Sequence, residues 1–211
     1  MTKNYFPFET CEKSHKDKMI AQPYSAVTNA LSSVIVLYYA LFSKHIYSTI
    51  FLFFIFAFTT FHAFSHAYHI SGSIQKHVIH VISYGINISL LYLLYRYSGK
   101  ALSTWIWFAL GVLVIFDFYA VFCLPTVFYM TSQWAIFLGI FAAYYRYLPK
   151  SFQQNIMWLF VIGIFILSMV WNESQNCDAL LEKYPDIPFH ILIEIPGLVF
   201  FYLVASQIYR L

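Results

Sequence analysis

The chain has 211 residues, of which 61% are hydrophobic, 22% aromatic and only 10% charged. A soluble domain carries about 25% charged residues, so this composition excludes a water-soluble globular protein and indicates a membrane protein. The net charge of +3 is small, and the cationic residues are scattered, which argues against a nucleic-acid partner. We therefore predict a single membrane domain over residues 1–211, with a polar N-terminal segment (1–24) before a helical bundle (25–211).

Seven apolar stretches of the chain approach the length that crosses about 30 Å of hydrocarbon. Each carries little charge and none shows the alternating polar face of a barrel strand, which favours helices. We therefore predict an all-α fold, a polytopic membrane protein built as a seven-transmembrane-helix bundle. In chain order the predicted spans are Ser25–Phe42, Tyr47–Tyr68, His77–Tyr95, Leu102–Cys123, Thr126–Tyr145, Ile156–Trp171 and Pro188–Tyr209.

Seven crossings place the two termini on opposite sides of the membrane. Lysine and arginine divide equally between the sides, so the positive-inside rule does not decide the orientation. Acidic residues gather on the N-terminal side, which favours an N-terminus in the lumen or the exterior. The membrane would then be that of the endoplasmic reticulum or Golgi in a eukaryote, or the inner membrane in a bacterium.

Histidines are concentrated in the second and third predicted spans, and His190 opens the seventh with Glu194 one turn deeper. Ionisable groups inside a membrane are costly and usually face a functional interior. On the predicted topology, four residues from three helices share one depth near the N-terminal interface and can converge on one metal ion. They are His69, His80, Asp186 and His190.

The same residue types also fit structural roles. His62, His66 and His77 can each hydrogen-bond a neighbouring helix without binding a metal. Asp186 lies two residues before a proline and suits the N-cap of the seventh helix. If Asp186 lies outside that helix, Glu194 becomes the better carboxylate ligand.

A few imidazoles with a carboxylate and an open position suit zinc. Zinc lowers the pKa of a bound water to near 7 and so provides a hydroxide nucleophile at neutral pH. Ser65 lies four residues before His69, one turn away on a helix, where its hydroxyl could orient that water or stabilise an oxyanion. The pattern is therefore compatible with hydrolysis of an amide or an ester.

Four short segments, in order along the chain, carry a family resemblance. They are Glu9-Thr10-Cys11-Glu12 with Ile20-Ala21-Gln22 and Val27-Thr28-Asn29, then Ser65-His66-Ala67-Tyr68-His69, then Trp171-Asn172-Glu173 through Cys177, and finally His190-Ile191-Leu192. The set resembles signatures of the alkaline ceramidases: an N-terminal acidic segment, a second-span serine and histidine, a Trp-Asn…Cys segment and a last-helix histidine. That family belongs to a superfamily that also contains the progestin/adiponectin-type receptors.

The resemblance implies an intramembrane zinc amidase that hydrolyses ceramide-like lipid amides to a sphingoid base and a fatty acid. His69 matches the zinc-ligand histidine of the second helix, and Ser65 matches the family serine. His190 matches one histidine of the family's His-x-x-x-His pair.

This chain departs from the family pattern in its ligand set. In one register Asp186 replaces the first histidine of the pair, and His80 stands where the family has an aspartate. In the other register Glu194 replaces the second histidine. Either way one expected imidazole is missing, so a degraded, inactive site is an open alternative.

The resemblance also implies a calcium site and a disulfide. Glu9 and Glu12 match two calcium-binding carboxylates, but two further ligand positions differ, so we expect calcium binding to be weak or absent. Cys11 and Cys177 stand where the family pairs its own cysteines, on one side of the membrane. A disulfide there requires an oxidising compartment.

The predicted reaction begins with a long-chain amide that enters laterally from the lipid. Zinc activates its carbonyl and the attacking water, Ser65 assists the oxyanion, and His80 carries the proton to the leaving amine. Two alternatives from other classes stay open: a non-catalytic receptor or lipid-binding protein on the same scaffold, and a haem-binding electron carrier that uses paired histidines. The sequence leaves the chain-length preference and the oligomeric state undetermined.

Overall fold

The computed structural model describes residues 11–12, 19–68, 70 and 72–211, and within these residues the regular structure is entirely helical. Seven of the described helices are long and apolar enough to cross a membrane, which confirms the predicted seven-helix bundle and an integral, multi-pass membrane protein. The helices are α1 (Pro23–Leu41), α2 (Ile46–Ala67), α3 (Gly72–Ser98), α4 (Thr104–Cys123), α5 (Thr126–Tyr144), the short 3-10 helix η1 (Tyr145–Tyr147), α6 (Lys150–Lys183) and α7 (Ile191–Ile208).

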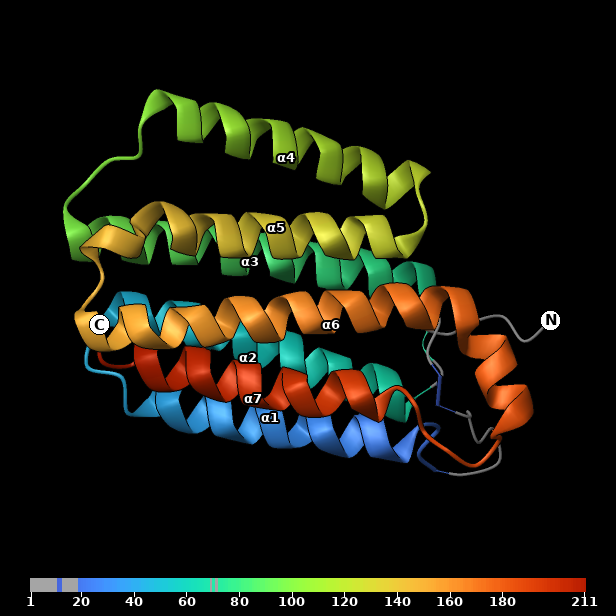
Figure 1. The fold of residues 1–211 in the computed structure, drawn as a ribbon. Coiled ribbons are helices and arrows are strands. Elements are labelled where there is room, and N and C mark those ends of the chain that lie inside the picture. The colour runs from blue at the N-terminus through green and yellow to red at the C-terminus, as the bar shows by residue number, and fades with distance from the viewer. Residues whose placement is uncertain (1–10, 13–18, 69, 71) are drawn as a thin grey trace.

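The helices alternate in direction between the two ends of the bundle (Figure 1). α1 and α2 pack against each other and against α7, and α6 also lies against α7. α3 packs against α2 on one side and against α5 on the other. α4 packs chiefly against α5 and stands at the edge of the bundle (Figure 1). The starts of α1 and α7, the end of α2 and the last turns of α6 meet at one end, which we call the N-terminal end (Figure 1).

Small polar side chains line the contact between α1 and α2. Ser33 Oγ lies 3.0 Å from Thr59 Oγ1 and accepts a hydrogen bond of 3.2 Å from Thr60 Oγ1. Without a hydrophobic force between helices in lipid, small side chains and hydrogen bonds drive their close approach. This contact places the C-terminal end of α2 beside the first turns of α1.

α6 is longer than its apolar span. The predicted span was Ile156–Trp171, but the helix continues to Lys183, because polar residues end a membrane span without breaking a helix. No proline or glycine interrupts the chain after Trp171 until Pro185. This polar extension of α6 carries Glu173 and Cys177 to the N-terminal end of the bundle.

Residues 11 and 12 attach to two parts of that end. Cys11 forms a disulfide with Cys177 of the α6 extension, with 5.2 Å between the Cα atoms, as the family resemblance predicted. The buried Glu12 carboxylate accepts hydrogen bonds from the backbone N–H groups of Tyr24 (2.9 Å) and Ser25 (3.0 Å), and from the Ser25 hydroxyl. Glu12 thus caps the first turn of α1, where backbone N–H groups have no partner within the helix.

We predict that Glu12→Ala lowers the free energy of unfolding by about 2 kcal/mol, because a buried charged acceptor of three hydrogen bonds is lost. Thermal unfolding in detergent micelles would measure the change, and Glu182→Ala, at an exposed position of α6, is the matched control. The loss should be the same with calcium and with a chelator. A loss seen only in calcium would make Glu12 a calcium ligand instead of a helix cap.

Candidate metal centre

Three imidazoles and one carboxylate meet at the N-terminal end of the bundle. α2 supplies His62 and His66, which are one helical turn apart, while His190 immediately precedes α7 and Glu194 lies one turn into it. The Oε1 atom of Glu194 lies 3.8 Å from His62 Nε2, 3.3 Å from His66 Nε2 and 2.9 Å from His190 Nε2. All four side chains are buried, and we call this group the His/Glu cluster.

The Nδ1 atom of His66, the ring nitrogen that faces away from Glu194, contacts the chain that precedes α1. Gln22 donates from Nε2 to the backbone carbonyl of Glu12 (2.7 Å), which leaves its Oε1 to face His66 Nδ1 at 2.9 Å. His66 must therefore donate from Nδ1, and the lone pair of its Nε2 points at the carboxylate of Glu194. Two lone pairs 3.3 Å apart repel each other unless a positive charge lies between them.

The outer nitrogen of His190 is held by a second carboxylate. Its Nδ1 lies 2.8 and 2.9 Å from the two oxygens of Glu173, which also accepts a hydrogen bond from the backbone N–H of Cys11. On the other side of the cluster, Asn29 donates to Glu194 Oε2 at 2.7 Å. Outer partners of this kind orient the histidines of metal sites.

The charges of the cluster can be balanced either by a proton or by a cation. Burial lowers the pKa of His190, but Glu173 and Glu194 outweigh this effect and raise the pKa to about 10. In the absence of a metal the imidazole would therefore carry a proton between the two carboxylates. A divalent cation would replace this proton and balance both negative charges, and imidazole nitrogens with a carboxylate oxygen are a suitable ligand set.

The structure brings two of the predicted ligands together and separates a third from them. His190 and Glu194 are in contact. Asp186 is exposed in the turn before α7, so its four-residue spacing to His190 is not a helical turn. This corresponds to the predicted alternative in which Glu194 is the carboxylate ligand. His69 lies outside the described residues, so its role as a ligand stays a prediction.

The two residues predicted to assist catalysis lie in different surroundings. Ser65 is fully buried on α2, next to His66. His80, on α3, has its Nδ1 3.5 Å from Asp117 Oδ2 of α4 and its ring against Tyr129 of α5, with 5.5 Å between the ring centroids. His80 therefore belongs to a second buried polar group.

Asp117 is the centre of this second group, which we call the Asp117 network. Its fully buried carboxylate accepts hydrogen bonds from the Tyr84 hydroxyl (3.0 Å), from Gln133 Nε2 (2.7 Å) and from the Ser132 hydroxyl. Asn87 Nδ2 in turn donates to Gln133 Oε1 at 2.9 Å. An ionisable group so deep in a membrane bundle is a candidate for a functional role.

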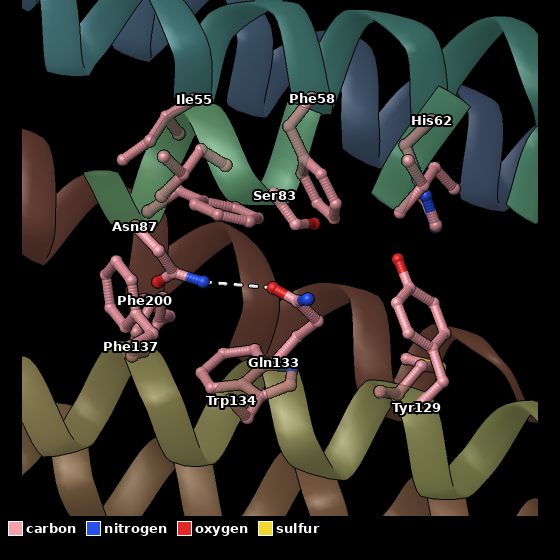
Figure 2. Close-up of a pocket in the computed structure, with 14 residues that line it drawn as sticks. Ile55, Phe58, His62, Ser83, Asn87, Tyr129, Gln133, Trp134, Phe137 and Phe200 are labelled. Atoms are coloured by element: carbon pink, nitrogen blue, oxygen red, sulfur yellow. Dashed lines mark hydrogen bonds between the residues drawn. The ribbon is translucent and has the colours of Figure 1, made fainter. Parts of the chain in front are cut away.

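A cavity inside the bundle extends from the His/Glu cluster to the Asp117 network (Figure 2). His62 belongs to the cluster and also lines the cavity, opposite Tyr129, whose hydroxyl points toward the side of His62 (Figure 2). Asn87 and Gln133 lie at the other end of the cavity (Figure 2). The remaining walls are mainly aliphatic and aromatic, as expected for a site that accepts a lipid chain.

The cysteine pair and Glu12 at the same end have structural assignments. Cys11 and Cys177 lie beside Glu173, but their sulfur atoms are bonded to each other and so are not thiolate ligands. The carboxylate of Glu12 caps α1, and Glu9 lies outside the described residues. Within the described part of the chain, the hydrogen bonds of Glu12 give it a structural role as a helix cap, and calcium binding stays a prediction.

Comparisons of this chain with protein-family models, with curated proteins and with solved structures return no match. The resemblance to the alkaline ceramidases therefore stays a prediction, and the functional argument depends on the geometry of the site.

Sequence analysis allowed His62 and His66 to contact a neighbouring helix, and both do so through Glu194 of α7. Their place in a shared cluster was not predicted, although their four-residue spacing repeats that of His190 and Glu194 and could have indicated it. Each pair puts two ligand atoms on one face of a helix. The outer partner Glu173 had no such signal, since it is brought near only by the extension of α6.

We predict that Glu173→Gln lowers the affinity of the cluster for a divalent cation about 10- to 100-fold, because it removes the negative charge behind His190 while keeping an acceptor. Competition with a chelator, followed by elemental analysis, would measure the affinity. Glu182→Gln, an exposed position of the same helix, is the control. Equal affinities for the two variants would contradict a supporting role for Glu173.

Proposed function

We propose that this protein is an intramembrane zinc-dependent amidase that hydrolyses ceramide-like lipid amides to a sphingoid base and a fatty acid. The observation that carries the proposal is the convergence of three buried imidazole Nε2 atoms within 3.8 Å of a single carboxylate oxygen of Glu194. The convergence lies at the head of an apolar cavity within a membrane bundle. The His/Glu cluster beside an apolar cavity suits a lipid, because the cavity can hold its hydrocarbon chain while the cluster acts on its polar group.

The metal would be held by His62, His66 and Glu194, whose ligand atoms lie within 4.8 Å of one another, with His190 Nε2 2.9 Å from the same carboxylate oxygen. Zinc bound there would supply Lewis-acid activation of an amide carbonyl and of a water molecule. Gln22 and Glu173 orient the outer ring nitrogens, so the Nε2 atoms are directed inward before any ion binds. This pre-orientation reduces the reorganisation that binding would require.

Two side chains keep their predicted roles in this proposal. Ser65, a fully buried residue that precedes His66 on α2, would act at the oxyanion. His80 would carry the proton to the leaving amine, as predicted. Its ring packs against that of Tyr129, whose hydroxyl borders the cavity (Figure 2).

We further propose that the N-terminal end of the bundle faces the lumen or the exterior. The Cys11–Cys177 disulfide lies at that end and requires an oxidising compartment. The membrane would be that of the endoplasmic reticulum or Golgi in a eukaryotic cell and the inner membrane in a bacterium. The His/Glu cluster would then lie near the same side.

A non-catalytic lipid-binding or receptor-like protein is the second candidate. A protonated His190 between two carboxylates would stabilise the same cluster with no metal, which is the observation that favours it. A haem protein fits the geometry poorly, because the carboxylate oxygen occupies the space between the imidazoles, where axial ligation needs a porphyrin.

We predict that the purified full chain binds zinc and hydrolyses a long-chain ceramide, and that His66→Ala loses most of the zinc and at least about 100-fold in turnover, since the loss of a ligand should exceed the loss of an outer partner. Elemental analysis and release of fatty acid would measure the two effects. His77→Ala is the matched control, because His77 is exposed on α3.

Three results would decide between the candidates. Unchanged turnover in His66→Ala would contradict the amidase. Zinc that is bound without hydrolysis across a panel of lipid amides would support the non-catalytic protein. A red preparation with a Soret band would support haem.

A further inference from the structure

The cavity has a polar strip along one side, formed by two pairs of residues on facing helices. Ser83 and Asn87 lie one turn apart on α3, and Tyr129 and Gln133 lie one turn apart on α5. Each pair spans about 6 Å along its helix axis, at 1.5 Å per residue. The strip therefore runs from the level of His62 and Tyr129 down to Asn87 and Gln133 (Figure 2).

The direction of the hydrogen bonds in the strip is set by the buried carboxylate. The Gln133 NH₂ group donates to Asp117 Oδ2 at 2.7 Å. The Gln133 oxygen is then the acceptor for the Asn87 NH₂ group, at 2.9 Å. The chain of donors and acceptors thus ends on the side-chain oxygen of Asn87.

That oxygen is an acceptor in need of a donor. Asn87 is 6% exposed, it lines the cavity, and no described residue donates to its Oδ1. A buried acceptor without a donor costs about 1–3 kcal/mol, so a ligand that supplies an O–H group there would gain affinity. Most of the other lining residues are apolar, so a hydroxyl carried on a hydrocarbon chain suits the site.

We propose that the cavity binds a lipid chain that carries a hydroxyl group, and that Asn87, oriented by Gln133 and Asp117, determines the preference for that hydroxyl over a plain chain. Ser83 lies one turn nearer to His62, with its hydroxyl pointing into the cavity (Figure 2), and provides a second polar contact on the same strip. The inference deepens the proposed function, because His62 joins the cavity to the metal cluster. The hydroxyl belongs either to the long-chain base or to the acyl chain, and the experiment distinguishes them.

The test measures binding, which needs neither zinc nor hydrolysis. Two matched pairs of single-chain lipids serve as probes: sphinganine against 4-hydroxysphinganine, and stearic acid against 2-hydroxystearic acid. Each is titrated into the purified full chain in detergent, and the dissociation constants are compared within each pair. We expect the hydroxylated member of one pair to bind up to about tenfold more tightly, the value of one hydrogen bond.

Asn87→Leu should abolish this difference within the pair. Its melting temperature should change little, because the substitution removes one oxygen without a donor and leaves another, that of Gln133, in its place. Asn176→Leu, an exposed position in the α6 extension, is the control and should keep the preference. If Asn87→Leu fails to fold, Gln133→Leu replaces it, since it removes the group that orients Asn87.

Equal binding within both pairs, no binding of any probe, or a preference that survives in Asn87→Leu would overturn the inference. The proposed function can fail separately. A chain that prefers the hydroxylated probe but hydrolyses no amide would keep this binding site and remove the amidase. A chain that hydrolyses ceramide but shows no preference for the hydroxylated probe would keep the amidase and remove this binding site.

Discussion

Glu194 Oε1 lies where the imidazoles of His62, His66 and His190 meet. A buried carboxylate in a membrane bundle is costly unless charges or donors compensate it, so this one group constrains the helices around it. α2 must present two histidines at its last turns, and α7 must begin where His190 can reach back to the same point. α1 contributes Asn29, which donates to the second carboxylate oxygen. Three helices are thereby fixed relative to one another at one end of the bundle.

The described part of the N-terminal segment and the α6 extension lie next to this centre. Gln22 contacts His66, and Glu173 contacts His190. Gln22 in turn hydrogen-bonds to Glu12, and Glu173 hydrogen-bonds to Cys11. The disulfide from Cys11 to Cys177 ties the segment to the extension covalently. The site is therefore supported by segments that are far apart in the sequence, and its geometry depends on how these segments lie relative to one another.

Hydropathy was sufficient to predict the seven helices, because each span has to satisfy its backbone within the lipid. It could not predict the length of α6, since Asn172 and Glu173 end the apolar run but not the helix. The same limit affected α7, where the loop before Ile191 leaves Asp186 exposed and makes Glu194 the partner of His190. Hydropathy along the chain predicts well which segments cross the lipid, but it predicts the exact ends of the helices poorly.

The ligand set was harder to predict for a related reason. A shift of one helical turn decides which histidines of α2 share a depth with His190, and sequence alone does not resolve such a shift. The structure places His62 and His66 at that depth. The Asp117 network, which joins α3, α4 and α5, depends on helix contacts that no local pattern encodes, although Asp117 itself was visible as an ionisable residue within a span.

X-ray absorption at the metal edge of the purified protein tests the central claim most directly. The account predicts a stoichiometric metal with a shell of nitrogen and oxygen ligands near about 2.0–2.1 Å, including the scattering pattern of imidazole rings. Sulfur ligands near about 2.3 Å, or no bound metal at all, would contradict it.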